Sequence, residues 1–140
     1  MAIQKVVFTS TVVDSLLTYS KMAYPNEGIL LLRGKSRKGV AEVTGVMIPP
    51  GATHAKSFSG FNWYMIPVDP SYLGVAHSHP SGYAVPSHQD LLHVTGRLMV
   101  IMGYPYTDSS CMGVFDREGR KIPFEVKQVD APELPPDFID

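Results

Sequence analysis

Cysteine is almost absent from this chain, whose 140 residues contain only Cys111. A single cysteine excludes an intrachain disulfide framework and any metal site built from several thiolates. We expect Cys111 to pack as a small hydrophobic residue of the core. An excess of charge of one sign is also lacking, because 12 Lys and Arg balance 13 Asp and Glu. The formal net charge of -1 gives no electrostatic argument for nucleic acid or an anionic membrane as a partner.

Long apolar runs are missing as well. The chain has no stretch of about 18 apolar residues, and it does not open with a basic segment followed by an apolar one. We therefore expect a soluble, cytoplasmic protein. What is present is an ordinary globular composition, with 44% hydrophobic and 18% charged residues. The length suits a single domain, which we place at residues 1–130, followed by a proline-rich C-terminal arm at 131–140.

A strand–helix–strand pattern opens the chain. Residues 6–8 predict a short strand, and residues 9–11 offer the N-cap of a helix that ends before Pro25. Residues 29–32 form a continuous apolar run, which is typical of a central strand buried on both faces. Glu27 would lie at the entry to that strand, and its plainest interpretation is a solvated residue in a turn.

The rest of the chain predicts a meander of strands. They are expected at residues 40–48, 61–66, 72–76, 98–102, 111–115 and 122–129, with turns at 35–39 and 116–119. Together these elements indicate an α/β sandwich in which a curved, mostly antiparallel sheet carries helices on its faces.

Two histidines stand at the end of the strand that begins at Tyr72. Alternate residues of a strand point to the same face, so His77 and His79 should project from one side of the sheet. Ser78 then points to the opposite face, where we expect it only to pack. Pro80 ends the strand.

An acidic residue follows at the start of a predicted helix. Ser87 suits the N-cap, and Asp90 lies three positions later. Two imidazoles and one carboxylate give three protein ligands with room for water, which is the arrangement of a catalytic zinc site. Ser87 and Asp90 also fit an ordinary capping box, and the same donor set suits Fe²⁺ or other divalent ions.

Other metal motifs do not fit this chain. A cupin-like site requires a Glu soon after the second histidine, and no acid lies between His79 and Asp90. A zinc deaminase requires a Pro-Cys-x-x-Cys segment, and a zincin requires His-Glu-x-x-His on a helix. Both are absent.

The complete string His77-Ser78-His79, seven residues, Ser87, two residues, Asp90 resembles the signature of the JAMM (MPN+) zinc metalloproteases. The glutamate that this family carries upstream is matched by Glu27, in a Pro-x-Glu context before an apolar strand. The resemblance implies a single-domain MPN (cytidine-deaminase-like) sandwich with a curved mixed sheet, of a compact archaeal or prokaryotic type. One departure is the short interval before His77, where family members usually carry a helix.

The resemblance also implies a role for each site residue. His77, His79 and Asp90 would hold one Zn²⁺ per chain, Glu27 would move protons, and Ser87 would steady the oxyanion. A strand at the place of Asn62, Trp63 and Tyr64 would lie beside the extended tail of the substrate.

Three functions follow from this resemblance. The first is an isopeptidase that removes ubiquitin or a ubiquitin-like modifier from lysine. The second is a peptidase that releases an amino acid from the tail of a sulfur-carrier protein, which the compact chain keeps open. The third is a non-catalytic scaffold, against which the presence of all five signature positions argues. The sequence leaves a homo-oligomer open.

Overall fold

The computed structural model describes residues 2–49, 70–87 and 96–129. The predicted strand at 61–66, the helix expected around Asp90 and the arm at 131–140 lie outside these residues. The described elements follow the chain as β1 (Lys5–Thr9), α1 (Ser10–Ala23), β2 (Ile29–Arg37), β3 (Val40–Met47), β4 (Tyr72–His79), β5 (Leu98–Gly103), the 3-10 turn η4 (Ser109–Cys111), β6 (Met112–Phe115) and β7 (Phe124–Lys127). In this part of the chain, no helix has the length and apolar character needed to span a membrane.

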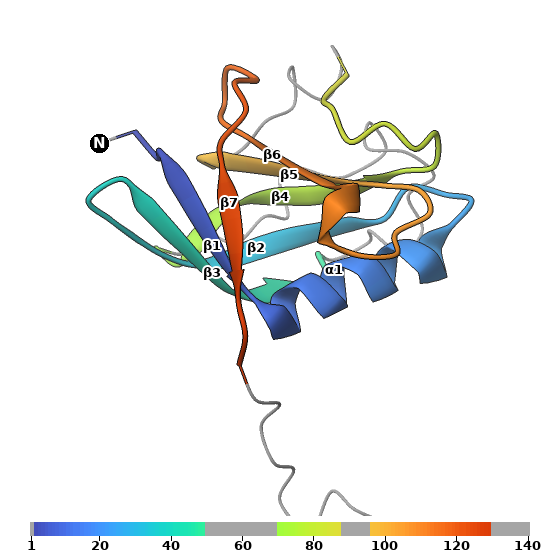
Figure 1. The fold of residues 1–140 in the computed structure, drawn as a ribbon, viewed down its shortest axis with the longest axis horizontal. Coiled ribbons are helices and arrows are strands. Elements are labelled where there is room, and N and C mark those ends of the chain that lie inside the picture. The colour runs from blue at the N-terminus through green and yellow to red at the C-terminus, as the bar shows by residue number, and fades with distance from the viewer. Residues whose placement is uncertain (1, 50–69, 88–95, 130–140) are drawn as a thin grey trace, which may run out of the picture.

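The strands form one mixed sheet in the order β6-β5-β4-β2-β3-β1-β7 (Figure 1). The predicted α/β class with a mixed sheet is thus confirmed. The expectation of a mostly antiparallel sheet is wrong for the described strands. β1 runs parallel to β3 and β7, and β4 runs parallel to β5. The other pairs, β2 with β3 and β4 and β5 with β6, are antiparallel. The parallel pairs arise because long crossovers, rather than hairpins, join these strands.

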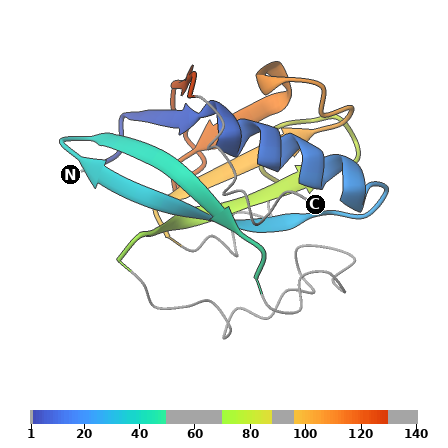
Figure 2. The ribbon, with the colours of Figure 1, turned by 90° about the horizontal axis from the view of Figure 1, so that it is seen from below.

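Helix α1 covers one face of the sheet, as Figures 1 and 2 show. Its N-cap is Thr9, whose hydroxyl accepts a hydrogen bond from the Val12 amide at 3.2 Å. The apolar side of the helix packs on β-strand residues such as Leu30 and Ala76 in the main hydrophobic core. The helix residues buried there are Val12, Val13, Leu16 and Leu17.

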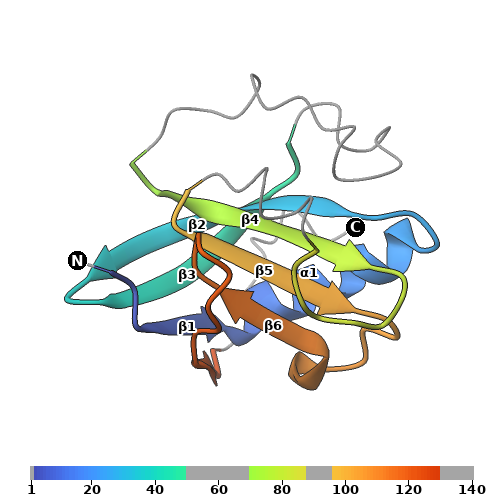
Figure 3. The ribbon, with the colours of Figure 1, turned by 90° about the horizontal axis from the view of Figure 1, so that it is seen from above.

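The opposite face of the sheet carries the segment that follows β4, as the view from above shows (Figure 3). A smaller apolar cluster of Met99, Ile101 and Phe115 lies on this side, with Ala84 of the segment packed against it. The sheet therefore has α1 on one face and residues 80–87 on the other.

The turn between β2 and β3 is a tight hairpin. The predicted turn at 35–39 is shorter than expected, because β2 continues to Arg37 and only Lys38 and Gly39 turn, with φ angles of 52° and 80°. Positive φ at both central residues is what a two-residue hairpin of this hand requires.

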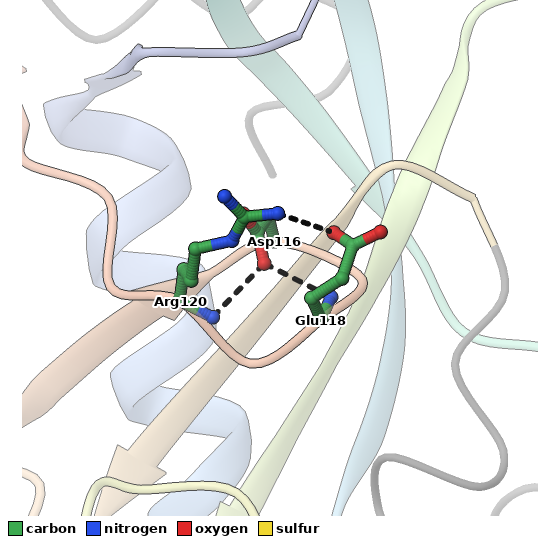
Figure 4. A network of polar contacts seen from close by, with 3 residues as sticks. All are labelled: Asp116, Glu118 and Arg120. Atoms are coloured by element: carbon green, nitrogen blue, oxygen red, sulfur yellow. Dashed lines mark hydrogen bonds and ion pairs between the residues drawn. The ribbon is translucent and has the colours of Figure 1, made fainter.

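The turn between β6 and β7 lies at 116–119, as predicted, and is organised by Asp116 (Figure 4). One of its carboxylate oxygens accepts from the amides of Glu118 and Arg120, each at 2.9 Å. The Arg120 guanidinium also reaches both acids, at 3.5 and 3.8 Å. Because its side chain is 76% exposed, these ion pairs add little stability, and the amide bonds define the turn.

Two expectations near the end of the described chain need correction. Cys111 is only partly buried, because it ends the 3-10 turn η4 rather than entering the core, and its sulfur lies 3.6 Å from the Thr107 hydroxyl. The last strand is shorter than predicted and spans Phe124–Lys127, since Pro123 lies just before it.

Candidate active site

His77 and His79 lie at the end of β4, on the face of the sheet opposite α1. Their neighbour Ala76 belongs to the core beneath the helix, so alternation along the strand turns both imidazoles the other way. The two rings are 5.0 Å apart between centroids. His77 is fully buried, and His79 retains 9% of its exposure. The prediction that both side chains share one face is confirmed.

Glu27 reaches the same place from the segment just before β2. Ile29 pairs with His77 across the antiparallel β2–β4 ladder, and the Ser78 amide continues the ladder by donating to the Gly28 carbonyl at 3.0 Å. One further step along this register brings Glu27 opposite His79. The pairing of β2 with β4 thus places Glu27 near the histidines and not in a solvated turn.

The prediction that Ser78 only packs is wrong. Its hydroxyl is buried and accepts a hydrogen bond from the Gly28 amide at 2.7 Å. Ser78 points away from the histidines, as predicted, but the strand beside it presents an amide within reach. The serine therefore ties the segment carrying Glu27 to the strand carrying the histidines.

A pocket of about 580 Å³ brings together three of the predicted site residues, Glu27, His79 and Ser87. The rest of its lining comes from the segment after β4, namely Pro80, Ser81, Tyr83, Val85 and Pro86. Ser87 is exposed there, so its hydroxyl is accessible to a bound molecule. The pocket offers a carboxylate, an imidazole and a hydroxyl beside an apolar wall.

The backbone carbonyl of Tyr83 holds His79. It lies 2.9 Å from Nδ1 of the ring, and a carbonyl can only accept, so Nδ1 carries the proton. Nε2 is then left as the nitrogen with a lone pair. Histidines that bind metals usually donate their other N–H to such a carbonyl or carboxylate, which fixes the tautomer and the ring orientation.

Two glycines allow the segment with Tyr83 to approach the sheet. A Cβ on Gly103 of β5 would lie 2.9 Å from the Gly82 carbonyl oxygen, and a Cβ on Gly113 of β6 would overlap the Ala84 carbonyl oxygen. Gly113 pairs with Ile101, which lies on the histidine face. The absence of side chains at these positions thus permits the contact between Tyr83 and His79.

The electrostatic surroundings of Glu27 include a buried tyrosine. Burial raises the pKa of Tyr106, the neighbouring Ser78 hydroxyl lowers it, and the charges of Tyr24, Glu27 and Tyr104 raise it further.

The donor set fits a divalent metal as far as the described residues extend. Two imidazoles converge, and one has its tautomer fixed for coordination through Nε2. Within residues 2–49, 70–87 and 96–129, no three His, Cys, Asp or Glu side chains gather to hold a metal ion. The third predicted ligand, Asp90, lies outside these ranges, as do Asn62, Trp63 and Tyr64.

Sequence reasoning missed two contributors, the Tyr83 carbonyl and the Ser78 hydroxyl. The first is a main-chain atom, and every residue has one, so the residue type does not show that it will contact His79. The second depends on the register of β2 on β4, which places Ser78 across from Gly28 and which the sequence does not give.

Known proteins resemble this chain in sequence. A family profile described as prokaryotic homologs of the JAB domain matches residues 9–112. A probable metalloprotease of Haloferax volcanii is 32% identical over 134 residues, covering 91% of this chain and 82% of the relative.

Solved structures resemble the chain as well. A JAB1/MPN domain protein from Archaeoglobus fulgidus has 24% identity and a TM-score of 0.60, covering 93% of this chain and all of that one. A structure described as a metalloprotease-like zinc site in the proteasome and signalosome, JAMM, has 25% identity and a TM-score of 0.57, covering 92% of this chain and all of its own.

Proposed function

The chain belongs to the JAB (JAMM/MPN) domain family, and from this premise we propose that it is a zinc-dependent isopeptidase. Its substrate would be the bond that follows the C-terminal tail of ubiquitin or a ubiquitin-like protein. The observation that carries the proposal is the pocket in which Glu27, His79 and Ser87 meet, with His79 held by the Tyr83 carbonyl.

The ligands in this proposal are His77, His79 and Asp90. Zinc, when bound, would act as a Lewis acid and bring the pKa of water towards about 7. The chain contributes the geometry, because β4 presents both imidazoles on one face and the Tyr83 carbonyl orients one of them.

In this proposal Glu27 transfers protons and Ser87 stabilises the oxyanion. The Glu27 carboxylate accepts the proton of the attacking water and delivers it to the leaving amine, so that one group serves as base and then as acid. The exposed Ser87 hydroxyl donates a hydrogen bond to the oxyanion that develops on the substrate carbonyl. A single donor of this kind contributes about 3 kcal/mol to other hydrolases.

Metal content and hydrolysis measured together test the proposal. Purified wild type should hold one zinc per chain and cleave a lysine-linked ubiquitin-like conjugate, and chelation should stop cleavage. His77→Ala, His79→Ala and Asp90→Ala should each lose most of the zinc. The matched control is His54→Ala, outside the proposed ligand set, which should keep both properties.

Two outcomes would change the proposal. If wild type contains no metal after preparation with zinc present, the proposal that the protein is a zinc-dependent enzyme is refuted. Cleavage of a sulfur-carrier protein extended by one amino acid, without cleavage of the lysine-linked conjugate, would reassign the substrate to the second class.

The extended tail of the substrate would pair with the strand predicted around Asn62, Trp63 and Tyr64. A proline in such an edge removes one backbone donor. Tyr64→Pro should therefore raise KM by about fivefold, the worth of roughly one hydrogen bond, while zinc content stays at the wild-type value. Tyr64→Phe keeps the amide and serves as the control. An unchanged KM in a folded Tyr64→Pro protein would argue against this edge.

A further inference from the structure

Hydrogen bonds between Ser78 and Gly28 join the strand that carries the two histidines to the segment that carries Glu27. Ser78 lies between His77 and His79 in sequence and points to the other face of β4. Gly28 follows Glu27 directly. Two hydrogen bonds connect them, from the Ser78 amide to the Gly28 carbonyl at 3.0 Å and from the Gly28 amide to the Ser78 hydroxyl at 2.7 Å.

Gly28 is also confined from the side of helix α1. A Cβ at this position would lie 2.8 Å from the Tyr19 ring and 3.1 Å from Cβ of Ala23. The backbone at residue 28 therefore sits between the helix and Ser78. Its position fixes where the chain emerges at Glu27.

Water has little access to this link. Ser78 is fully buried, and Tyr106 of the same core is 1% exposed. A buried amide that loses its partner incurs a desolvation penalty. If the Ser78 hydroxyl were removed, residues 27 and 28 would be driven to move until the Gly28 amide found another acceptor.

We propose that Ser78 is a positioning residue for Glu27, acting through the Gly28 amide to set the carboxylate against the pocket. This role rests on the proposed hydrolase function, because it matters only if Glu27 transfers protons. Ser78 itself contacts neither the substrate nor the metal. A misplacement of about 1 Å in a catalytic group can reduce the rate roughly 100-fold.

A matched pair of variants separates the hydroxyl from its volume. Ser78→Thr keeps the hydroxyl and Ser78→Val replaces it with a methyl of the same size, so any crowding is common to both. Relative to Ser78→Thr, Ser78→Val should lose roughly 10- to 100-fold in kcat, with KM and zinc content unchanged. Equal kcat values for the two variants would overturn the proposal. Ser78→Ala, which introduces no new atoms, repeats the comparison against wild type if the larger side chains prevent folding.

Amide hydrogen exchange gives a readout that is independent of activity. The Gly28 amide should be protected in wild type and in Ser78→Thr and should exchange faster in Ser78→Val. The Leu31 amide, inside β2, should stay protected in all three. Unchanged protection of Gly28 in Ser78→Val would also refute the proposed link.

Combining the variants with Glu27→Gln distinguishes this proposal from the function beneath it. If Ser78 acts through Glu27, Ser78→Val should cause no further loss of kcat in the Glu27→Gln background. A full additional loss would show that Ser78 acts by another route and overturn the positioning role. If wild type cleaves no substrate, the hydrolase function fails, and the exchange of the Gly28 amide alone decides whether Ser78 holds this segment.

Discussion

The position of Glu27 shows how a single residue gains a role from the backbone on either side of it. It stands just before β2, next to a glycine that is held by Ser78 and packed on Tyr19. The register of β2 on β4 turns it towards His79. The proposed role as a proton carrier beside His79, a proposed metal ligand, accounts for a carboxylate at the start of an apolar strand.

Replacing the carboxylate by an amide tests that role. Glu27→Gln keeps the size of the side chain but cannot take a proton, so kcat should fall by roughly 10²–10⁴-fold, the usual contribution of a positioned acid–base group. Zinc content should not change, because Glu27 is not a proposed ligand. Kinetics on a lysine-linked ubiquitin-like conjugate, with zinc measured on the same sample, gives the answer.

The control for this substitution is Glu42→Gln, an exposed carboxylate on β3. It should cleave at the wild-type rate. A Glu27→Gln protein as fast as this control would disprove the proton-transfer role even if the zinc site were correct.

At this scale the sequence predicts side chains better than main-chain atoms. The family resemblance carried by His77, His79, Ser87 and Glu27 nominates residues of which the fold brings Glu27, His79 and Ser87 to one pocket. The Tyr83 carbonyl could not be nominated, because every residue has one and only the path of the segment after Pro80 selects it. The partner of Ser78 depended on the β2–β4 register, which strand patterns alone do not give.

The segment between β4 and the start of the undescribed residues is the element that orients His79. Gly82 adopts a φ of +89°, and its amide donates to the His79 carbonyl at 3.3 Å. This turn brings the Tyr83 carbonyl back to the His79 ring. The segment can approach the sheet this closely because β5 and β6 carry glycines beneath it.

Gly113→Ala should therefore weaken zinc binding without touching a ligand. The new methyl would collide with the Ala84 carbonyl and lift the segment, so His79 would lose the acceptor that orients it. Losing such a partner usually reduces metal affinity about 10- to 100-fold. Competition with a chelator of known affinity measures the change.

Gly45→Ala is the matched control, because the atom closest to a Cβ there is 4.0 Å away. It should bind zinc as wild type does. If Gly113→Ala disturbs the sheet, as circular dichroism would show, Gly103→Ala offers a milder displacement, against Gly82 at 2.9 Å. Unchanged zinc affinity in folded variants of both glycines would mean that the Tyr83 contact does not support the metal.

On the scale of the whole molecule, the two faces of the sheet have different tasks. One face packs on α1 and contains the main core, while the other carries the histidines and the segment that covers them (Figure 3). The alternation along β4 makes this division, with Ala76 and Ser78 on one side and His77 and His79 on the other. Ser78 connects the two sides, since its core-facing hydroxyl fixes the backbone next to Glu27.

The fold class could be predicted because each element has its own local pattern, but the strand order could not. Consecutive strands are neighbours in roughly two-thirds of cases, yet β1 pairs with β3 and β7 and not with β2. Nothing in residues 6–8 encodes these distant partners. They follow from where α1 and the later crossovers leave room along the sheet.

The last prediction concerns the response of the whole fold to alkaline pH. Burial is the largest cause that raises the pKa of Tyr106 above 10.0, so the native state holds this proton more tightly than the unfolded chain does. The associated stability is fully present below pH 10 and is lost as the pH rises through the native pKa. Each such group lowers the free energy of unfolding by at most about 1.4 kcal/mol per pH unit.

Tyr106→Phe removes this titration while it keeps the ring, which packs edge-on against Tyr24 and Tyr104. The loss of stability above about pH 10 should therefore be shallower in Tyr106→Phe than in wild type. Urea denaturation at each pH measures the midpoint, and Tyr83→Phe, at a 71% exposed position, controls for removal of a tyrosine hydroxyl. The control Tyr83→Phe should lose stability with the wild-type slope. If Tyr106→Phe does so too, the buried Tyr106 hydroxyl does not determine the alkaline limit of the fold.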